Sequence, residues 1–343
     1  MGTSLLYHLT NKGMTNVVLL ERGDLASGST GDSAAIVRQH YSNEVSIHLV
    51  KKSLELFQSF RDELGTDVFT PSGWMFLVPA GVSAMFDENM ERLKRLGVRT
   101  WEVSVEEASR QLPGLNVEGI GRVAYEPDSG YADARGTANA FGLRAKERGA
   151  EVNTDTPATG IEKVSGRVRR VSTPRGEIET EVVVNAAGPW ARQVGEWVGL
   201  NLPLRISREQ DIVVRPPSGV PAAGMAVSNM VDRTYHRPEP GGLLLVGTGH
   251  PKPNDPADPD SYSREADAEF VRETSGLLAH RFPAMADATV VASWAGLYTI
   301  TPDWSMIVDR TPGAEGLYLA GGGSGHSFKL APAIGQCLTE LIA

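Results

Sequence analysis

The first 24 residues contain the pattern that most restricts the fold, an apolar helix followed by a short apolar strand with an acidic end. Leucines in residues 2–12 fall at helical spacing, and Gly13 is a typical helix stop. The run NVVLLERGD (16–24) is continuously apolar up to Glu21, as buried parallel strands are. Because parallel sheets need helices on their faces, this pair predicts an α/β fold class.

The same pair has the spacing of half a dinucleotide-binding βαβ unit. Glu21 follows Gly2 by 19 residues, near the ~20 at which an acid accepts hydrogen bonds from ribose hydroxyls. The strand and the two glycines that would precede Gly2 are not in the sequence, so we expect a chain truncated at its N-terminus. An ordinary helix–strand pair with a solvated acid is the alternative.

Composition bounds the class of protein without naming its activity. The 343 residues suggest two units or one large α/β unit. The net charge of −9 argues against a nucleic-acid or anionic-membrane partner. Cys337 is the only cysteine, which excludes intrachain disulfides and cysteine-rich metal sites and favours a cytoplasmic location. No signal peptide and no apolar run of ~18 residues is evident, and we expect no membrane span and no metal.

Two glycine-rich segments are candidates for ligand binding. The polar loop ASGSTG (26–31) offers many backbone N–H donors, which can wrap a pyrophosphate or a flavin ring. Residues 316–335 predict a strand, a tight GGGSGH turn and a helix, whose N-terminus favours negative charge. A plain surface loop and an ordinary glycine-rich turn are the alternatives.

Four segments together resemble the DAO family of FAD-dependent oxidoreductases, which includes sarcosine oxidases, glycine oxidase and D-amino-acid dehydrogenases. The segments are ERGDLASGSTG with IVRQHY (21–41), VVVNAAGPWA (182–191), WAGLYTITPDWSMIVD (294–309) and GLYLAGGGSGHSFKLAPAIG (316–335). The similarity runs in order over nearly the whole chain. Relatives usually continue beyond the last helix, so we expect truncation at the C-terminus too.

The resemblance implies a discontinuous architecture of class α/β, or α+β overall. Residues 1–70, 134–204 and 293–343 would form a Rossmann-like FAD-binding domain without its first strand. Residues 71–133 and 205–292 would form a substrate domain with a mixed sheet. Within the first domain, residues 44–65 predict an amphipathic helix whose apolar stripe includes Val45, Leu49, Leu56 and Phe60.

The resemblance also implies which residues bind FAD. Some members attach FAD to a cysteine, but Gly296 occupies that position here, so we expect non-covalent FAD. The residues expected to bind it are Gly2, Glu21, Arg22, Ser27, Ser29, Thr30, Gly31, Ala187, Gly188, Trp190, Gly322, Gly323, Gly325, His326 and Lys329.

Arg38, Lys329, Tyr298 and His326 are the expected catalytic residues. Arg38 and Lys329 match family positions that hold the substrate carboxylate, and the planar fork of arginine suits both carboxylate oxygens. Tyr298 would line the substrate pocket, and His326 would lie beside the flavin. The alternatives are an interdomain salt bridge for Arg38, a surface ion pair for Lys329 and a core tyrosine. His250 is interpreted as a turn histidine.

The implied activity is oxidation of the C–N bond of a small amino acid or N-methyl amino acid to an imine. The alternatives are a catalytic β-type subunit of a heteromeric dehydrogenase and a flavin-free pseudoenzyme; an NAD-dependent dehydrogenase would leave the C-terminal glycine turn unexplained. In similar oxidases a strand lysine near the flavin favours oxygen reduction, whereas this chain has Leu244 or Leu245 there. We therefore expect a dehydrogenase that passes electrons to a partner subunit or a quinone.

Overall fold

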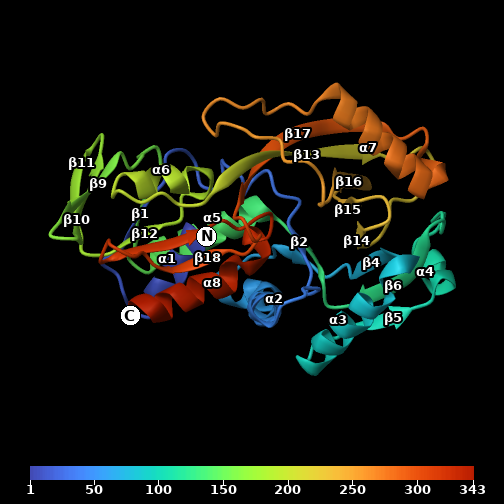
Figure 1. Ribbon diagram of the computed structural model, residues 1–343, viewed down its shortest axis with the longest axis horizontal. Coiled ribbons are helices and arrows are strands. Elements are labelled where there is room, and N and C mark those ends of the chain that lie inside the picture. The colour runs from blue at the N-terminus through green and yellow to red at the C-terminus, as the bar shows by residue number, and fades with distance from the viewer.

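The computed structural model describes all 343 residues, which form a region of helices and small sheets beside a large mixed sheet (Figure 1). In the first region α1 (Gly2–Asn11) packs against α5 (Ala134–Glu147) and α8 (Ser327–Ile342). Leu5 and Leu9 of α1 are buried in one apolar cluster with side chains of α8. This packing brings the first turns of α1 and α8 together, where Ser4 Oγ donates to the Ala331 carbonyl at 2.8 Å.

Short parallel strands complete this region. β1 (Val18–Leu20) pairs in parallel with β8 (Glu151–Asn153), and β12 (Val183–Asn185) pairs in parallel with β19 (Leu317–Gly321). β18 (Ile307–Arg310) is antiparallel to β19. The parallel direction of the 16–24 segment agrees with the α/β prediction. Its burial is lower than predicted, because β1 pairs with β8 alone and Val18 remains 38 % exposed.

The second region is built on an eight-stranded sheet in the order β17-β13-β16-β15-β14-β4-β6-β5. The only parallel pairing in it joins β14 to β4. The strands are β4 (Trp74–Pro79), β5 (Trp101–Val103), β6 (Ile120–Glu126), β13 (Arg205–Arg215), β14 (Ala226–Asn229), β15 (Thr234–Glu239), β16 (Leu243–Thr248) and β17 (Thr289–Ile300). The long strands β13 and β17 extend toward the helical region (Figure 1).

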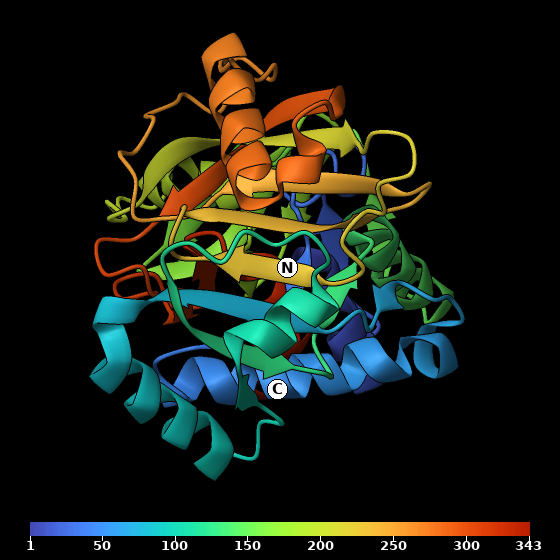
Figure 2. The same cartoon turned by 90° about the vertical axis from the view of Figure 1, so that its right-hand side faces the viewer.

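One face of this sheet holds the largest apolar core. Ile212, Val214, Leu244 and Val246 point to that face and pack with residues of α7 (Ala268–Arg281). Figure 2 shows α7 and α4 (Val105–Gln111) on the near side of the strands. Because successive side chains of a strand alternate between faces, the intervening residues of β13 and β16 point toward the helical region.

Smaller elements join the two regions. The three-stranded sheet β2 (Ile36–Val37), β7 (Gly130–Ala132) and β3 (Phe69–Thr70) connects them. A meander of three antiparallel strands covers the far end of the helical region. The remaining elements are β9 (Gly160–Val164), β10 (Arg167–Thr173), β11 (Gly176–Glu179), α3 (Ser83–Arg95), α6 (Ala191–Glu196) and three single 3-10 turns at Ala80–Val82, Gly188–Trp190 and Pro283–Met285.

The helix predicted over 44–65 is α2 (Glu44–Leu64), but its buried face differs from the predicted stripe. Asn43 caps it by accepting a hydrogen bond from the Ser46 amide at 2.8 Å, and Gly65 ends it with φ +80°. Val45 is 70 % exposed, whereas Phe60 is buried as predicted. The buried face is formed by Ile47, Val50, Leu54, Phe57, Phe60 and Leu64. No helix of the chain has the length and apolarity needed to span a membrane.

Candidate active site

A cavity of about 720 Å³ lies between the helical region and the inner face of the eight-stranded sheet. Its walls come from the first turn of α1, the 29–40 segment, residues 186–189, strands β13, β15 and β17, and the turn before α8. A volume of this size is ordinary for ligand sites, which are typically about 300–1,000 Å³. The cavity therefore collects segments from nearly the whole length of the chain.

The glycine-rich turn before α8 forms one wall of the cavity. Gly322 and Gly325 have φ of +70° and +81°, a left-handed conformation that favours glycine. A Cβ at Gly325 would overlap the Tyr298 ring, and one at Gly322 would overlap Thr301. The glycines therefore bring the backbone close to β17 and leave the start of α8, with its free N–H groups, facing the cavity.

Arg38 and Lys329 lie in the cavity wall without an acidic partner. Arg38 Nη1 donates to the carbonyl of His40, and its guanidinium lies 4.9 Å from the Tyr41 ring centroid. Lys329 is 8 % exposed, and burial together with the Arg38 charge lowers its pKa well below the ordinary value. Two cations close together in a buried site are costly unless an anion joins them. The pair is therefore suited to holding a carboxylate.

His326 lies beside these cations and is held near neutral charge. Burial and the charges of Lys329 and Arg38 lower the pKa of His326 well below its ordinary value. Its Nδ1 lies 3.2 Å from the Tyr41 hydroxyl, and burial raises the pKa of Tyr41 to about 12. Both groups are thus uncharged near neutral pH, and His326 presents a neutral ring to the positive side of the cavity.

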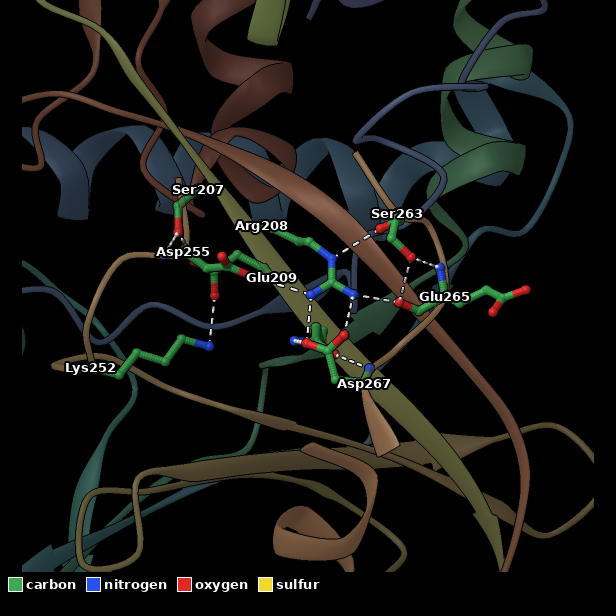
Figure 3. Close-up of polar contacts among 9 residues, drawn as sticks. Ser207, Arg208, Glu209, Lys252, Asp255, Ser263, Glu265 and Asp267 are labelled. Carbon is green, nitrogen blue, oxygen red and sulfur yellow. Dashed lines mark hydrogen bonds and ion pairs between the residues drawn. The ribbon is translucent and has the colours of Figure 1, made fainter. Parts of the chain in front are cut away.

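The opposite wall carries two acids and a tyrosine that sequence reasoning did not single out, together with Tyr298, which it did. Glu209 and Asp211 of β13, Tyr235 of β15 and Tyr298 of β17 all line the cavity. Glu209 bonds Lys252 Nζ at 2.7 Å (Figure 3) and lies 3.3 Å from His250 Nε2. Burial would raise the pKa of Glu209, but these partners lower it below its ordinary value. His250, interpreted above as a turn residue, is thus part of the cavity wall.

The loop after β16 is tied to the other side of β13. Figure 3 shows Arg208 reaching Asp267, Ser263 and Glu265 while Glu209 reaches Lys252. Arg208 Nη1 lies 2.7 Å from Asp267 Oδ2, and its Nε donates to the Ser263 carbonyl at 2.9 Å. These contacts anchor the loop of residues 252–263 along the sheet edge.

The comparisons with known proteins settle the family. Residues 1–341 match the family described as DAO, FAD dependent oxidoreductase. The chain belongs to the DAO family. Its predicted fold class and its dependence on FAD are thereby confirmed, and the family members it is similar to include sarcosine, glycine and proline oxidases or dehydrogenases.

Individual relatives of this DAO-family chain are similar over its whole length. FAD-dependent oxidoreductase domain-containing protein 1 of Xenopus laevis is 28 % identical over 390 residues, covering 100 % of this chain and 77 % of that protein. Sarcosine oxidase subunit beta of Rhodobacter capsulatus is 26 % identical over 356 residues, with 100 % and 82 % covered. The crystal structure of L-proline dehydrogenase from P. horikoshii superposes with a TM-score of 0.91 at 27 % identity, covering 99 % of this chain and 90 % of that chain.

The cavity residues of this DAO-family chain fit FAD. Ser29 Oγ is buried in the wall without any hydrogen-bond partner, as expected of a group that bonds a ligand. The glycines of the turn before α8 have no Cβ that would obstruct a flavin ring, and the N-terminus of α8 supplies positive potential. The predicted FAD-binding residues that line the cavity are Ser29, Thr30, Gly188, Gly322, Gly323, Gly325, His326 and Lys329.

Other predicted FAD-binding residues do not line the cavity. Glu21 Oε1 accepts from the Gly23 amide at 3.0 Å. Arg22 Nη1 and Trp190 Nε1 each bond Asp260 Oδ1 at 2.9 Å, and the Arg22 guanidinium lies 4.5 Å from the Trp190 ring centroid. The remaining ones are Gly2, Ser27, Gly31 and Ala187. Their part in FAD binding stays a prediction.

Proposed function

We propose that the chain oxidises the C–N bond of a small amino acid or N-methyl amino acid to an imine. The observation that carries this proposal is the pair Arg38 and Lys329, two cations without an acidic partner in the wall of a cavity that fits FAD. Relatives named as a sarcosine oxidase subunit and an L-proline dehydrogenase support an amino-acid substrate.

Each wall of the cavity has a defined task in this reaction. FAD, when bound, accepts the hydride equivalent from the carbon next to the nitrogen. Arg38 and Lys329 hold the carboxylate and so fix the orientation of that carbon. Trp74, Phe76 and the Tyr298 ring restrict water in the substrate space. Burial and the charges of Glu209 and Asp211 raise the pKa of Tyr298, so its hydroxyl remains a neutral donor.

A substrate panel tests the proposal. The holoenzyme is mixed without oxygen with glycine, sarcosine, dimethylglycine, proline and D-amino acids, and bleaching of the flavin absorbance is followed. Each amino acid is paired with the amine that lacks its carboxylate, such as methylamine for glycine. We expect bleaching by at least one amino acid and far slower bleaching by its paired amine. A yellow protein that no amino acid bleaches would refute the proposal.

We expect FAD to be held without a covalent bond. Cys337 is the only thiol, and it is exposed on α8 outside the cavity wall. Gly296 lines the cavity at the position where the family resemblance places a cysteine in some members. Acid precipitation of the holoenzyme should therefore release the flavin into the supernatant, as measured by its absorbance. Flavin that stays with the pellet contradicts this expectation.

We also expect the reduced enzyme to react slowly with oxygen and faster with a dye or a quinone. Leu244 packs in the apolar core, and Leu245 lies on the opposite face between Val213 and Arg237. β16 itself contains no charged residue, and Arg237 of the neighbouring β15 is paired with Glu239 at 2.7 Å, so this part of the sheet offers no free charge to stabilise a developing oxygen anion.

Rapid mixing of the reduced enzyme with oxygen and with a quinone measures this difference. The Leu245→Lys variant should accelerate reoxidation by oxygen, and an exposed control, Val164→Lys, should not. An oxygen rate in the wild type that matches turnover, with one hydrogen peroxide per substrate, would show that the chain is an oxidase.

A further inference from the structure

Asp211 is a buried carboxyl group that faces the cavity with one oxygen free. The residue is 6 % exposed, and its Oδ1 accepts a hydrogen bond from the Tyr235 hydroxyl at 2.8 Å. No other hydrogen bond and no salt bridge reaches it. Glu209, two residues earlier on the same face, is instead bonded by Ser207, His250 and Lys252. A carboxyl buried with so few partners is expensive unless a ligand completes its shell.

The local backbone is shaped for this carboxyl group. Gly247 of β16 lies directly between Asp211 of β13 and Tyr235 of β15 in the sheet register. A Cβ at Gly247 would overlap both the Asp211 carboxylate and the Tyr235 ring. The hydrogen bond across two strand spacings therefore depends on this glycine, which indicates a built position for the Asp211 side chain.

The charges of the cavity match the two charges of an amino acid. Arg38, with Lys329 beside it, makes one side positive, and Asp211 gives the other side a carboxyl group. Tyr298 is within electrostatic reach of both sides, because the Asp211 charge acts to raise the pKa of its hydroxyl and the Arg38 charge acts to lower it. An α-amino acid near neutral pH carries a carboxylate and an ammonium group on one carbon, and each finds its counterpart here.

We propose that Asp211 binds the ammonium group of the substrate and takes one of its protons before the C–N bond is oxidised. This inference rests on the function proposed above. In the step an N–H bond breaks, an O–H bond forms on the Asp211 carboxyl, and the electron pair stays on nitrogen. No oxidant is needed for this transfer. The freed pair is what allows hydride to leave the neighbouring carbon and the C=N bond to form.

The environment of Asp211 suits a base that works near neutral pH. Burial raises the pKa of Asp211 to about 7, although the Tyr235 hydrogen bond and nearby cations act to lower it. A general base is most effective when its pKa lies near the working pH. The charged and titratable groups that face Asp211 are Glu209 on β13, Tyr235 and Arg237 on β15, Tyr298 on β17, and Lys252 after β16.

Two ligands that cannot be oxidised test the binding part. The holoenzyme is titrated with 2-aminoisobutyrate, which has no hydrogen on its α-carbon, and with isobutyrate, which lacks the amine. The Asp211→Asn variant should bind 2-aminoisobutyrate about tenfold or more weakly, the usual worth of a charged hydrogen bond. Its affinity for isobutyrate should change by less than about twofold. Asp287→Asn, an exposed carboxyl, is the matched control and should bind both ligands normally.

The outcomes separate this inference from the proposed function. If Asp211→Asn binds both ligands as the wild type does, or loses both equally, Asp211 does not bind the amine and the inference fails. If isobutyrate does not bind to the wild type at all, the carboxylate site of Arg38 and Lys329 fails, and the proposed function fails with it.

The pH profile tests the proton transfer. Below pH about 7 Asp211 is protonated in the free enzyme and cannot accept a proton, so kcat/KM should fall there. In Asp211→Asn this limb near pH 7 should disappear. Its kcat/KM should instead rise with the fraction of substrate whose amine is unprotonated, up to the amine pKa of about 10. Tyr235→Phe removes the hydrogen bond that lowers the Asp211 pKa, so the acidic limb of kcat/KM in this variant should move to higher pH. A limb near pH 7 that persists in Asp211→Asn would assign the base to another group.

Discussion

Replacing Arg38 by methionine should lower kcat/KM for the amino-acid substrate by about 10- to 150-fold. This range corresponds to about 1.5–3 kcal/mol for a charge-assisted hydrogen bond. The methionine keeps the bulk that packs near Tyr41 and Trp74 but loses the planar fork that matches a carboxylate. FAD content should remain normal, because the side chain acts on the substrate. Steady-state kinetics and the flavin-to-protein absorbance ratio measure the two effects.

Two comparisons make the Arg38 result specific. Arg61→Met removes an arginine that is 74 % exposed on α2 and should leave the kinetics unchanged. The loss in Arg38→Met should be much smaller for an amine without a carboxylate, since that ligand never used the guanidinium. Wild-type kinetics of Arg38→Met with several carboxylate substrates would remove Arg38 from the site.

The two cations on the positive side of the cavity were predicted from the resemblance to the DAO family. Arg38 and Lys329 lie almost 300 residues apart, yet each belongs to a segment that carries the resemblance, 21–41 and 316–335. Glycine turns and helix N-termini act through the backbone, so local sequence reports them directly. Packing of α1 against α8 then brings these segments to one cavity.

The negative side was missed because its signal depends on the fold. Ser207, Glu209 and Asp211 alternate along SREQDIVV, a pattern that usually marks the solvent face of a strand. Here that face is covered by the helical region and lines the cavity instead. These acids are buried rather than solvated only because the helical region packs over this face of the eight-stranded sheet. Periodicity likewise located helix 44–65 but not its buried face, because Val45 lies beyond the partners that cover Ile47.

Replacing Arg281 by methionine should lower the free energy of unfolding by about 3–5 kcal/mol, the usual cost of breaking a buried ion pair. Arg281 is 2 % exposed at the end of α7, and its Nε lies 2.6 Å from Asp232 Oδ2. Its Nη1 also donates to the carbonyls of Asn116 and Glu118. One guanidinium thus ties α7, the β14–β15 turn and the 116–118 loop together. Urea unfolding followed by circular dichroism measures the loss.

The pH dependence of this loss identifies its cause. Burial would raise the pKa of Asp232, but Arg281 lowers it below its ordinary value. A depressed carboxyl pKa stabilises the fold above the unfolded pKa of about 3.9, and this contribution fades as pH falls through the folded value. In Arg281→Met the unpaired Asp232 is instead relieved by protonation, so the difference in the free energy of unfolding from wild type should shrink toward pH 4.

Two further variants serve as controls. Adding Asp232→Asn to Arg281→Met should recover part of the lost stability at pH 7. Arg272→Met removes an arginine that is 70 % exposed on the same helix and should change stability little. A loss that stays constant from pH 8 to pH 4, and that Asp232→Asn does not reduce, would mean that the packing of the side chain and not its charge holds α7 in place.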